Sequence, residues 1–312
     1  MKKIGIVFPG QGSQYVGMGR SLYDSDEDIK RIFDEADRIL GFSIKGLSFE
    51  GPEDELRKTY NTQPAVLLVS YATWIKLQKE TGLEPIVLSG HSLGEYTALL
   101  VSGFFSLDEA LNITRKRGIF MENAYPEGKG GMVALLSPFM ELVRSTIEEI
   151  SLDGRVITIA NLNSPDQIVI SGEISALKEA VERMKGKGYK KAVFLNVSGP
   201  FHSPLMREAA DKLLEELKRL KGFELMYPVV FNVDASLERN KEHVYEKLYS
   251  QMFSPVRWEE CVKRMVDEGV EIFLEVGPKN VLTNLIKRIV PGVPCFSVEN
   301  PDDIEKIKEI LK

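Results

Sequence analysis

The sequence predicts an α/β protein, because short apolar runs of strand length alternate with longer segments of helical periodicity. The chain has 312 residues, which is enough for a large domain with a smaller insert. The repeated order of strand and helix favours a parallel sheet covered by helices. A region in the middle of the chain has a different order of elements and predicts a second, smaller unit.

The first apolar run, Ile4–Phe8, predicts a buried strand. It ends at Pro9 and Gly10, too early for the apolar core of a signal peptide, so we expect no targeting segment. No apolar stretch approaches the roughly 18–20 residues that a membrane helix needs, so we expect no membrane association. Helices are expected at Asp26–Leu40, Ala65–Lys79 and Ser106–Ala124, the last opening with the capping box "SLDE". Further strands are expected at Ile86–Ser89, Val229–Val233, Ile272–Val276 and Pro294–Val298.

Residues 131–197 have the order β-α-β-β-α-β, which is that of a ferredoxin-like unit. The glycine-containing segments "EGKGG" and "SGPFHS" flank this region. We therefore expect a small ferredoxin-like domain at 128–198, inserted into a core made of residues 1–127 and 199–312.

Composition excludes several classes of protein. The formal charge of −6, without a compensating basic segment, argues against nucleic-acid binding. The two cysteines, Cys261 and Cys295, do not form a zinc-site pattern or a disulfide framework. We expect both to be buried free thiols in a cytoplasmic protein.

The stretch "VLSGHSLGEYTALL" contains the pattern G-x-S-x-G, centred on Ser92, between an apolar strand and a helix. A strand–turn–helix context is what a nucleophile elbow requires, so Ser92 is the candidate nucleophile. The alternative is a glycine-rich helix start at which Ser92 is only a cap.

A serine hydroxyl needs a base to remove its proton, and the chain has three histidines. His91 adjoins the serine and should point away from it, and His243 lies in a charged, surface-like segment. His202, in "NVSGPFHSPLM", is therefore the candidate base. Neither Asp234 nor Glu95 suits the third position of a triad, so we expect a Ser-His dyad, with a carbonyl orienting the imidazole.

A glycine-rich turn, "FPGQGSQYVGMG", follows the first strand. It does not fit the dinucleotide pattern G-x-G-x-x-G, because Tyr15 occupies the last glycine position. We expect either a plain tight turn or a loop beside the elbow whose backbone N–H of Gln11, with that of Leu93, forms an oxyanion hole.

Arg117 lies within an otherwise apolar stripe of the helix that follows the elbow helix. A buried arginine needs an anionic partner. The partner could be an internal carboxylate or the carboxylate of a substrate.

Seven segments together resemble the malonyl-CoA:acyl carrier protein transacylases and the related acyltransferase domains of polyketide synthases. They are "FPGQGSQ", "SGHSLGEYTAL", "RKRGIFM", "ANLNSPDQIVISG", "VSGPFHSPLM", "YSQMFSPVRW" and "LEVGPKNVL", and they span almost the whole chain in order. The resemblance implies an α/β-hydrolase-like parallel-sheet core with an inserted ferredoxin-like small domain. It also implies Ser92 as the acylated nucleophile and His202 as the base. The remaining implied site residues are Arg117 for the malonate carboxylate, Gln11 and Leu93 for the oxyanion, Gln251 beside His202, and Asn161 and Phe201 at the cleft.

The implied activity is ping-pong transfer of malonyl from a coenzyme A thioester to the phosphopantetheine thiol of an acyl carrier protein. No metal or other cofactor is expected, and the protein is expected to be a monomer that binds its acidic carrier transiently. The basic segment "RMKGKGYKK", with Lys187, Lys190 and Lys191, and the pair Lys287 and Arg288 are candidate docking sites.

Two other functions remain open at this stage. A serine esterase or thioesterase would use the same dyad with water as the acceptor. A non-enzymatic nucleotide-binding module would use the loop "GQGSQ" instead.

Overall fold

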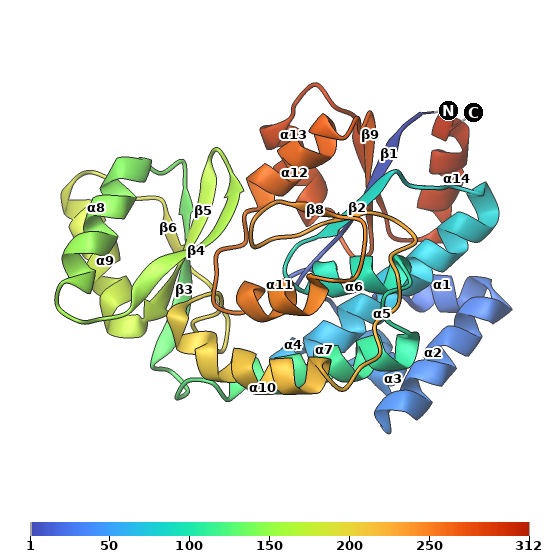
Figure 1. Ribbon diagram of the computed structural model, residues 1–312, viewed down its shortest axis with the longest axis horizontal. Helices are drawn as coiled ribbons and strands as arrows, with labels where there is room; N and C mark the ends of the chain where they lie inside the picture. Colours follow the sequence, from blue (N-terminus) through green and yellow to red (C-terminus); the bar gives the residue numbers. More distant parts are fainter. Residues whose placement is uncertain (1, 312) are drawn as a thin grey trace.

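The computed structural model describes residues 2–311 and contains two separate sheets. Figure 1 shows the smaller sheet with its two helices at one end of the molecule and the larger sheet in the other part. The chain is thus of the α/β class, as predicted.

The larger sheet has the strand order β10-β9-β1-β2-β7-β8. Its first five strands are parallel to one another, and β8 pairs antiparallel with β7 at the edge, so the sheet is mixed. Its strands are β1 (Ile4–Phe8), β2 (Val87–Gly90), β7 (Val229–Val230), β8 (Leu237–Glu238), β9 (Ile272–Val276) and β10 (Cys295–Val298).

Helices cover both faces of this sheet. Successive residues of a strand point to opposite faces, and β1, β2 and β9 are buried at every position, so both faces need a cover. Ile6 of β1 packs into the core with α5, α6 and α7, whereas its neighbour Val7 packs with α12 and α13. The helices of this part are α1 (Arg20–Ser25), α2 (Glu27–Leu40), α3 (Ile44–Glu50), α4 (Glu53–Arg57), α5 (Thr59–Thr81), α6 (Leu93–Val101), α7 (Leu107–Glu122), α10 (Arg207–Leu217), α11 (Val244–Gln251), α12 (Trp258–Asp267), α13 (Val281–Ile289) and α14 (Pro301–Leu311), with a 3₁₀ turn at Pro204–Met206.

The smaller sheet has the order β4-β5-β3-β6, and its neighbouring strands are antiparallel. Val133 and Leu135 of β3 pack against α8 and α9, while Met132 and Ala134 face the core of the larger part. Its elements follow the predicted β-α-β-β-α-β order: β3 (Gly130–Leu136), α8 (Met140–Ser151), β4 (Ile157–Ser164), β5 (Gln167–Glu173), α9 (Ile174–Gly186) and β6 (Ala192–Phe194).

The two parts are joined by backbone hydrogen bonds as well as by side chains. Val256, from the segment before α12, donates to the carbonyl of Ala160 at 2.8 Å and accepts from the N–H of Leu162 at 2.9 Å. The edge strand β4 is thus bridged to the larger part through Val256, which holds this strand as one wall of the space between the sheets.

Two expected elements differ from the structure by more than two residues at one end. The strand expected at Val229–Val233 ends at Val230, because the backbone N–H of Asn232 donates to the carboxyl of Glu95 instead of to a strand. The helix expected from Ala65 begins six residues earlier, at Thr59, and carries Pro64 inside it. Proline is disfavoured inside a helix, and here the packing of the buried helix outweighs that local preference.

Gly118 sets the distance between the two long helices α5 and α7. A Cβ atom at this position would lie 2.5 Å from the Cα of Tyr60 and 2.8 Å from the carbonyl oxygen of Thr59. These neighbours are backbone atoms and cannot move aside as a flexible side chain can. The close approach also holds Arg117, the preceding residue, next to α5.

We predict that Gly118→Ala lowers the free energy of unfolding by about 1–3 kcal/mol, the usual cost of overpacking a tight contact. Urea denaturation followed by circular dichroism measures the change. The matched control is Gly186→Ala, because nothing lies within 4 Å of a Cβ at that helical position. Equal stability of the two variants would show that α5 and α7 can separate freely.

Candidate active site

Ser92 occupies the turn between β2 and α6, with φ 51° and ψ −99°. A positive φ is unusual for a residue that has a Cβ and is typical of a strained turn. The turn is closed by two glycines that leave no room for a side chain. A Cβ on Gly90 would lie 2.0 Å from the backbone of Gly94, and one on Gly94 would lie 2.0 Å from the carbonyl oxygen of Phe8. The local geometry is that of a nucleophile elbow.

The hydroxyl of Ser92 and the imidazole of His202 lie within hydrogen-bonding distance, with Oγ 2.8 Å from Nε2. On the other side of the ring, Nδ1 lies 2.9 Å from the backbone carbonyl oxygen of Gln251. A carbonyl can only accept, so Nδ1 carries the proton and Nε2 is free to accept one from Ser92. The orienting group is a carbonyl, as expected, and not a carboxylate.

The imidazole of His202 is held in its neutral form. Burial lowers its pKa to about 3, and the nearby positive charge of Arg117 acts in the same direction. A neutral imidazole at physiological pH can take up the serine proton, as a general base must.

The guanidinium of Arg117 lies beside this pair and is 1% exposed. Its Nη2 donates to Ser92 Oγ at 3.1 Å and to Gln251 Oε1 at 2.8 Å, and its Nη1 donates to Gln63 Oε1 at 2.8 Å. No carboxylate within residues 2–311 forms an ion pair with it. The sequence left two possible partners for Arg117, an internal carboxylate or the carboxylate of a substrate. The described part of the chain does not supply the internal one.

Two residues that sequence reasoning missed hold the elbow in place. Asn232 accepts the backbone N–H of Ser92 at 2.7 Å and donates to the carbonyl of Gly90 at 2.8 Å. Glu95, fully buried, accepts the N–H of Asn232 at 2.6 Å. The sequence pointed to Glu95 and to the segment "FNVDAS" only as sources of a triad acid, a role that neither suited; Asp234 of that segment bonds to Lys247.

Ser92 and His202 open into a cavity of about 230 Å³ between the two sheets. Gln11, Asn161 and Phe201 line the same cavity. Leu93 is the first residue of α6, where backbone N–H groups have no partner within the helix. Gln251 lies behind the dyad, where its Nε2 donates to the Ser92 carbonyl at 3.1 Å. The structure thus brings all eight predicted site residues to one region.

Neither of the other two histidines bonds to Ser92, although His91 lines the catalytic cavity. The Nε2 of His91 is 2.9 Å from Oδ1 of Asn163 on β4, so its ring points toward the smaller sheet and away from Ser92 Oγ. His243 is exposed at the start of α11. Both cysteines are buried and unpaired, as expected.

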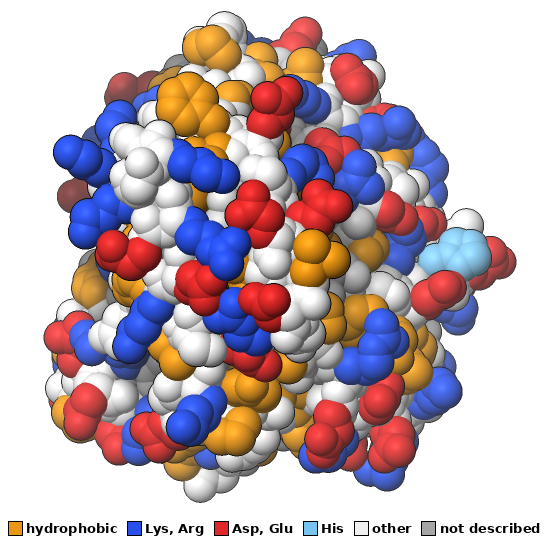
Figure 2. Space-filling view, turned by 90° about the vertical axis from the view of Figure 1, so that its left-hand side faces the viewer, with side chains coloured by type: hydrophobic (Ala, Val, Ile, Leu, Met, Phe, Trp, Pro, Cys, Tyr) orange, Lys and Arg blue, Asp and Glu red, His pale blue; other side chains and the backbone are white. Residues whose placement is uncertain are grey.

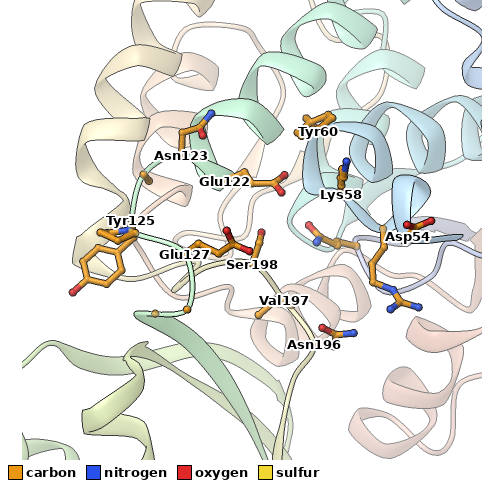
Figure 3. Close-up of a pocket in the computed structure, with 16 residues that line it drawn as sticks. Asp54, Lys58, Tyr60, Glu122, Asn123, Tyr125, Glu127, Asn196, Val197 and Ser198 are labelled. Carbon is orange, nitrogen blue, oxygen red and sulfur yellow. The ribbon is translucent and has the colours of Figure 1, made fainter. Parts of the chain in front are cut away.

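A larger cavity of about 960 Å³ lies next to the first and shares Gln11 and Val197 with it. Figure 3 shows Lys58 and Tyr60 from the larger part on one side of it and Tyr125 from the connection to the smaller sheet on the other. The catalytic cavity is therefore not isolated, and the space between the two parts extends past Gln11.

Within residues 2–311, no group of three or more His, Cys, Asp or Glu side chains is arranged to hold a metal ion. No helix in this part of the chain is long and apolar enough to cross a membrane.

Comparison with known proteins places this geometry in a family. The model of the acyl transferase domain matches residues 6–297. The chain belongs to the acyl transferase domain family. Its relatives include the malonyl CoA-acyl carrier protein transacylase of Bacillus subtilis (strain 168), 44% identical over 312 residues that cover all of this chain and 98% of the relative. Another is the enzyme of the same name from Escherichia coli (strain K12), 39% identical over 99% of this chain and all of that protein.

Solved structures of acyl transferases agree along the whole chain. An acyl carrier protein S-malonyltransferase from Vibrio cholerae superimposes with a TM-score of 0.94 at 40% identity, covering 98% of this chain and 100% of the other. A malonyl-transacylase solved in complex with a type II PKS acyl-carrier protein has a TM-score of 0.96 at 38% identity, covering 99% and 100%. Because these superpositions cover both sheets, the relatives share the arrangement of a larger and a smaller sheet seen here.

We predict that kcat/KM of this acyl transferase stays nearly constant between about pH 7.5 and about pH 5, because His202 remains neutral there. A histidine with an ordinary pKa near 6.5 would lose about thirtyfold over that interval. Initial rates with malonyl-CoA give the profile, and circular dichroism at each pH checks that the fold persists. An acidic limb centred near the ordinary value would show that burial does not hold the base neutral.

Proposed function

We propose that this protein transfers a malonyl group from malonyl-CoA, through an ester on Ser92, to the phosphopantetheine thiol of an acyl carrier protein. The single observation that supports malonyl as the group is Arg117. It is a fully buried cation beside the nucleophile, and it has no ion-pair partner among the described residues. A buried cation is stabilised by an anion that binds with it, and malonyl offers a free carboxylate.

In the first half of the proposed reaction, His202 Nε2 takes the proton of Ser92, and Oγ attacks the thioester carbonyl carbon. Negative charge develops on the carbonyl oxygen, and the backbone N–H groups of Gln11 and Leu93 donate to it. The C–S bond then breaks, coenzyme A leaves as a thiol with the proton from His202, and malonyl remains as an ester on Ser92.

In the second half, the carrier's thiol gives its proton to His202, and its sulfur attacks the ester carbonyl. The bond to Ser92 Oγ breaks, and Oγ recovers the proton from His202. The steps balance without an electron carrier or metal, so we propose that no cofactor is required. Asn161 and Phe201 line the cavity and would shape it around the acyl group.

We further propose that the architecture is an α/β-hydrolase-like core, residues 1–127 and 199–312, with a ferredoxin-like small domain at 128–198. The strand order β4-β5-β3-β6, with both helices packed on one face, supports this assignment of the smaller sheet. The elbow between β2 and α6 supports the assignment of the larger part. A monomer in the cytoplasm fits the proposed activity.

We predict that intact-mass spectrometry after mixing with malonyl-CoA will show one malonyl adduct on the wild-type protein and none on Ser92→Ala. Addition of holo acyl carrier protein should move the adduct to the carrier. An adduct that decays to free malonate before carrier is added would indicate a thioesterase instead. If the wild-type protein forms no adduct, the elbow has been misinterpreted.

We propose that the carrier docks beside the mouth of the catalytic cavity, at the small-domain face that carries Lys190 and Lys191. Figure 2 shows basic and acidic side chains interspersed over this end of the molecule. Arg183, Lys185 and Lys187 of the basic segment form ion pairs with glutamates of α8 and α9.

Lys190 and Lys191 are exposed, and neither forms an ion pair within residues 2–311. They precede β6, and Leu195, just after that strand, lines the catalytic cavity. On the facing helix α13, Arg288 lies 3.5 Å from Asp166, which leaves Lys287 as the more available charge. Free lysines on the segment that leads to the cavity-lining Leu195 suit a transient contact with an acidic carrier.

We predict that the double variant Lys190→Glu and Lys191→Glu raises KM for the carrier about tenfold and leaves KM for malonyl-CoA unchanged, because only the carrier contacts these side chains. The matched control is Lys306→Glu on α14, at the far end of the molecule (Figure 1). Transfer kinetics with varied carrier concentration give the values. Equal carrier KM in the double variant and the control would place docking elsewhere.

A further inference from the structure

The charge of Arg117 is held by two amide side chains from distant parts of the chain. Gln63 on α5 accepts from Nη1 through Oε1, and Gln251 at the end of α11 accepts from Nη2 through its own Oε1, both at 2.8 Å. Gln63 is 0% exposed and Gln251 is 1% exposed. The two amides fix both ends of the guanidinium fork while adding no net charge.

The orientation of the Gln63 amide is set from both sides. Its oxygen accepts from Arg117, which can only donate, and its Nε2 lies 3.3 Å from the sulfur of Met121. Met121 lines the catalytic cavity. Gln63 therefore connects the guanidinium to the wall of the cavity in which the acyl group would lie.

The other ionisable groups that face Arg117 do not supply a compensating charge. Glu95 on α6 bonds to the backbone of Asn232, and burial raises its pKa to about 8, so it is mostly protonated at neutral pH. Tyr96, also on α6, presents its ring 5.1 Å from the guanidinium, and burial raises the pKa of its hydroxyl. His202 is neutral. The guanidinium thus keeps a nearly full charge in a buried site.

A carboxylate at position 63 would have the same shape as the amide and would change this balance. It would form a buried ion pair with Arg117, and the charge would no longer be available to a ligand. A buried arginine is usually paired with a carboxylate. Because position 63 carries a neutral amide instead, Arg117 can still pair with the carboxylate of a ligand.

We propose that Gln63 is a positioning residue that determines acyl specificity: it orients Arg117 through a neutral oxygen and so keeps the guanidinium charge available for the carboxylate of the incoming acyl group. This inference rests on the proposed malonyl transfer. It assigns to Gln63 the preference for an acyl group that carries a second carboxylate over one that does not.

The test compares malonyl-CoA with acetyl-CoA as donors for the wild-type protein and for Gln63→Glu. We expect the ratio of kcat/KM for malonyl-CoA to that for acetyl-CoA to fall by at least about tenfold in the variant, because the new carboxylate competes with that of malonate. An unchanged ratio in a folded variant would overturn the proposal.

Gln63→Leu is the matched control, since it removes the hydrogen bond without adding charge. We expect the malonyl-CoA to acetyl-CoA ratio to fall by clearly less than in Gln63→Glu, because Arg117 is then less well oriented but its charge stays available to the acyl carboxylate. If Gln63→Leu changes the ratio as much as Gln63→Glu does, the effect comes from packing and the proposal fails. Gln63→Asp introduces a shorter carboxylate at the same position and gives the same test if Gln63→Glu does not fold.

The pH dependence of kcat/KM distinguishes an effect of charge at position 63 from an effect of altered packing. The groups that face His202 are Arg117 and His91, and those that face Arg117 are Glu95 and Tyr96. Pairing Arg117 with a new carboxylate should move the acidic limb of kcat/KM for acetyl-CoA upward by about one pH unit, since less positive charge then opposes protonation of His202. The limb should not move in Gln63→Leu, and a limb that stays in place in Gln63→Glu would contradict the inference.

The two proposals fail in different ways. If the wild-type protein does not prefer malonyl-CoA or forms no adduct on Ser92, then the proposed function is wrong. If the wild-type protein prefers malonyl-CoA and Gln63→Glu keeps that preference, only the assignment to Gln63 is wrong.

Discussion

The site depends on one close contact between backbones, where α6 begins against the end of β1. Gly94 lies so near the carbonyl oxygen of Phe8 that a Cβ would be 2.0 Å from it. This approach brings the N-terminus of α6 over the carboxyl ends of two parallel strands, the usual place for a ligand in such sheets. Ser92 is thereby forced into a positive φ, and the loop with Gln11 lies beside it. The nucleophile, the helix N-terminus and the adjoining loop meet because the two backbones touch.

The strain at Ser92 is held by contacts from far along the chain. Asn232 bridges the N–H of Ser92 and the carbonyl of Gly90, and Glu95 fixes Asn232 in turn. These bonds explain why β7 is short: residues that would extend the strand are used to brace the turn. A residue in a sparsely populated conformation persists only where its surroundings over-determine it, and this network does so.

The sequence was sufficient for those features that have a local pattern. The G-x-S-x-G motif and the capping box at Ser106 have fixed spacings, and the structure contains both. His202 was singled out by elimination among three histidines, and its imidazole does lie beside Ser92. Gln63 and Asn232 could not be found in this way. Gln63 accepts from Arg117, 54 positions away, and Asn232 accepts from Ser92, 140 positions away. A single hydrogen bond between such distant residues leaves no periodic pattern in the sequence. The early start of α5 was hidden by Pro64 for a related reason, because tertiary packing overrode a local rule.

Burial disfavours the charged form of all three ionisable groups at the site, but only two of them become neutral. Burial keeps His202 and Glu95 neutral, since a charged group costs free energy away from water. Arg117 cannot respond in this way, because its pKa is too high for burial to neutralise it. The site is therefore left with one uncompensated positive charge, held by neutral amides and in hydrogen-bonding distance of Ser92 Oγ. In the proposed function, an acyl group with a carboxylate would pair with Arg117, remove that imbalance and weaken the charge that opposes protonation of His202. Substrate binding and the strength of the base would then be coupled through a single guanidinium.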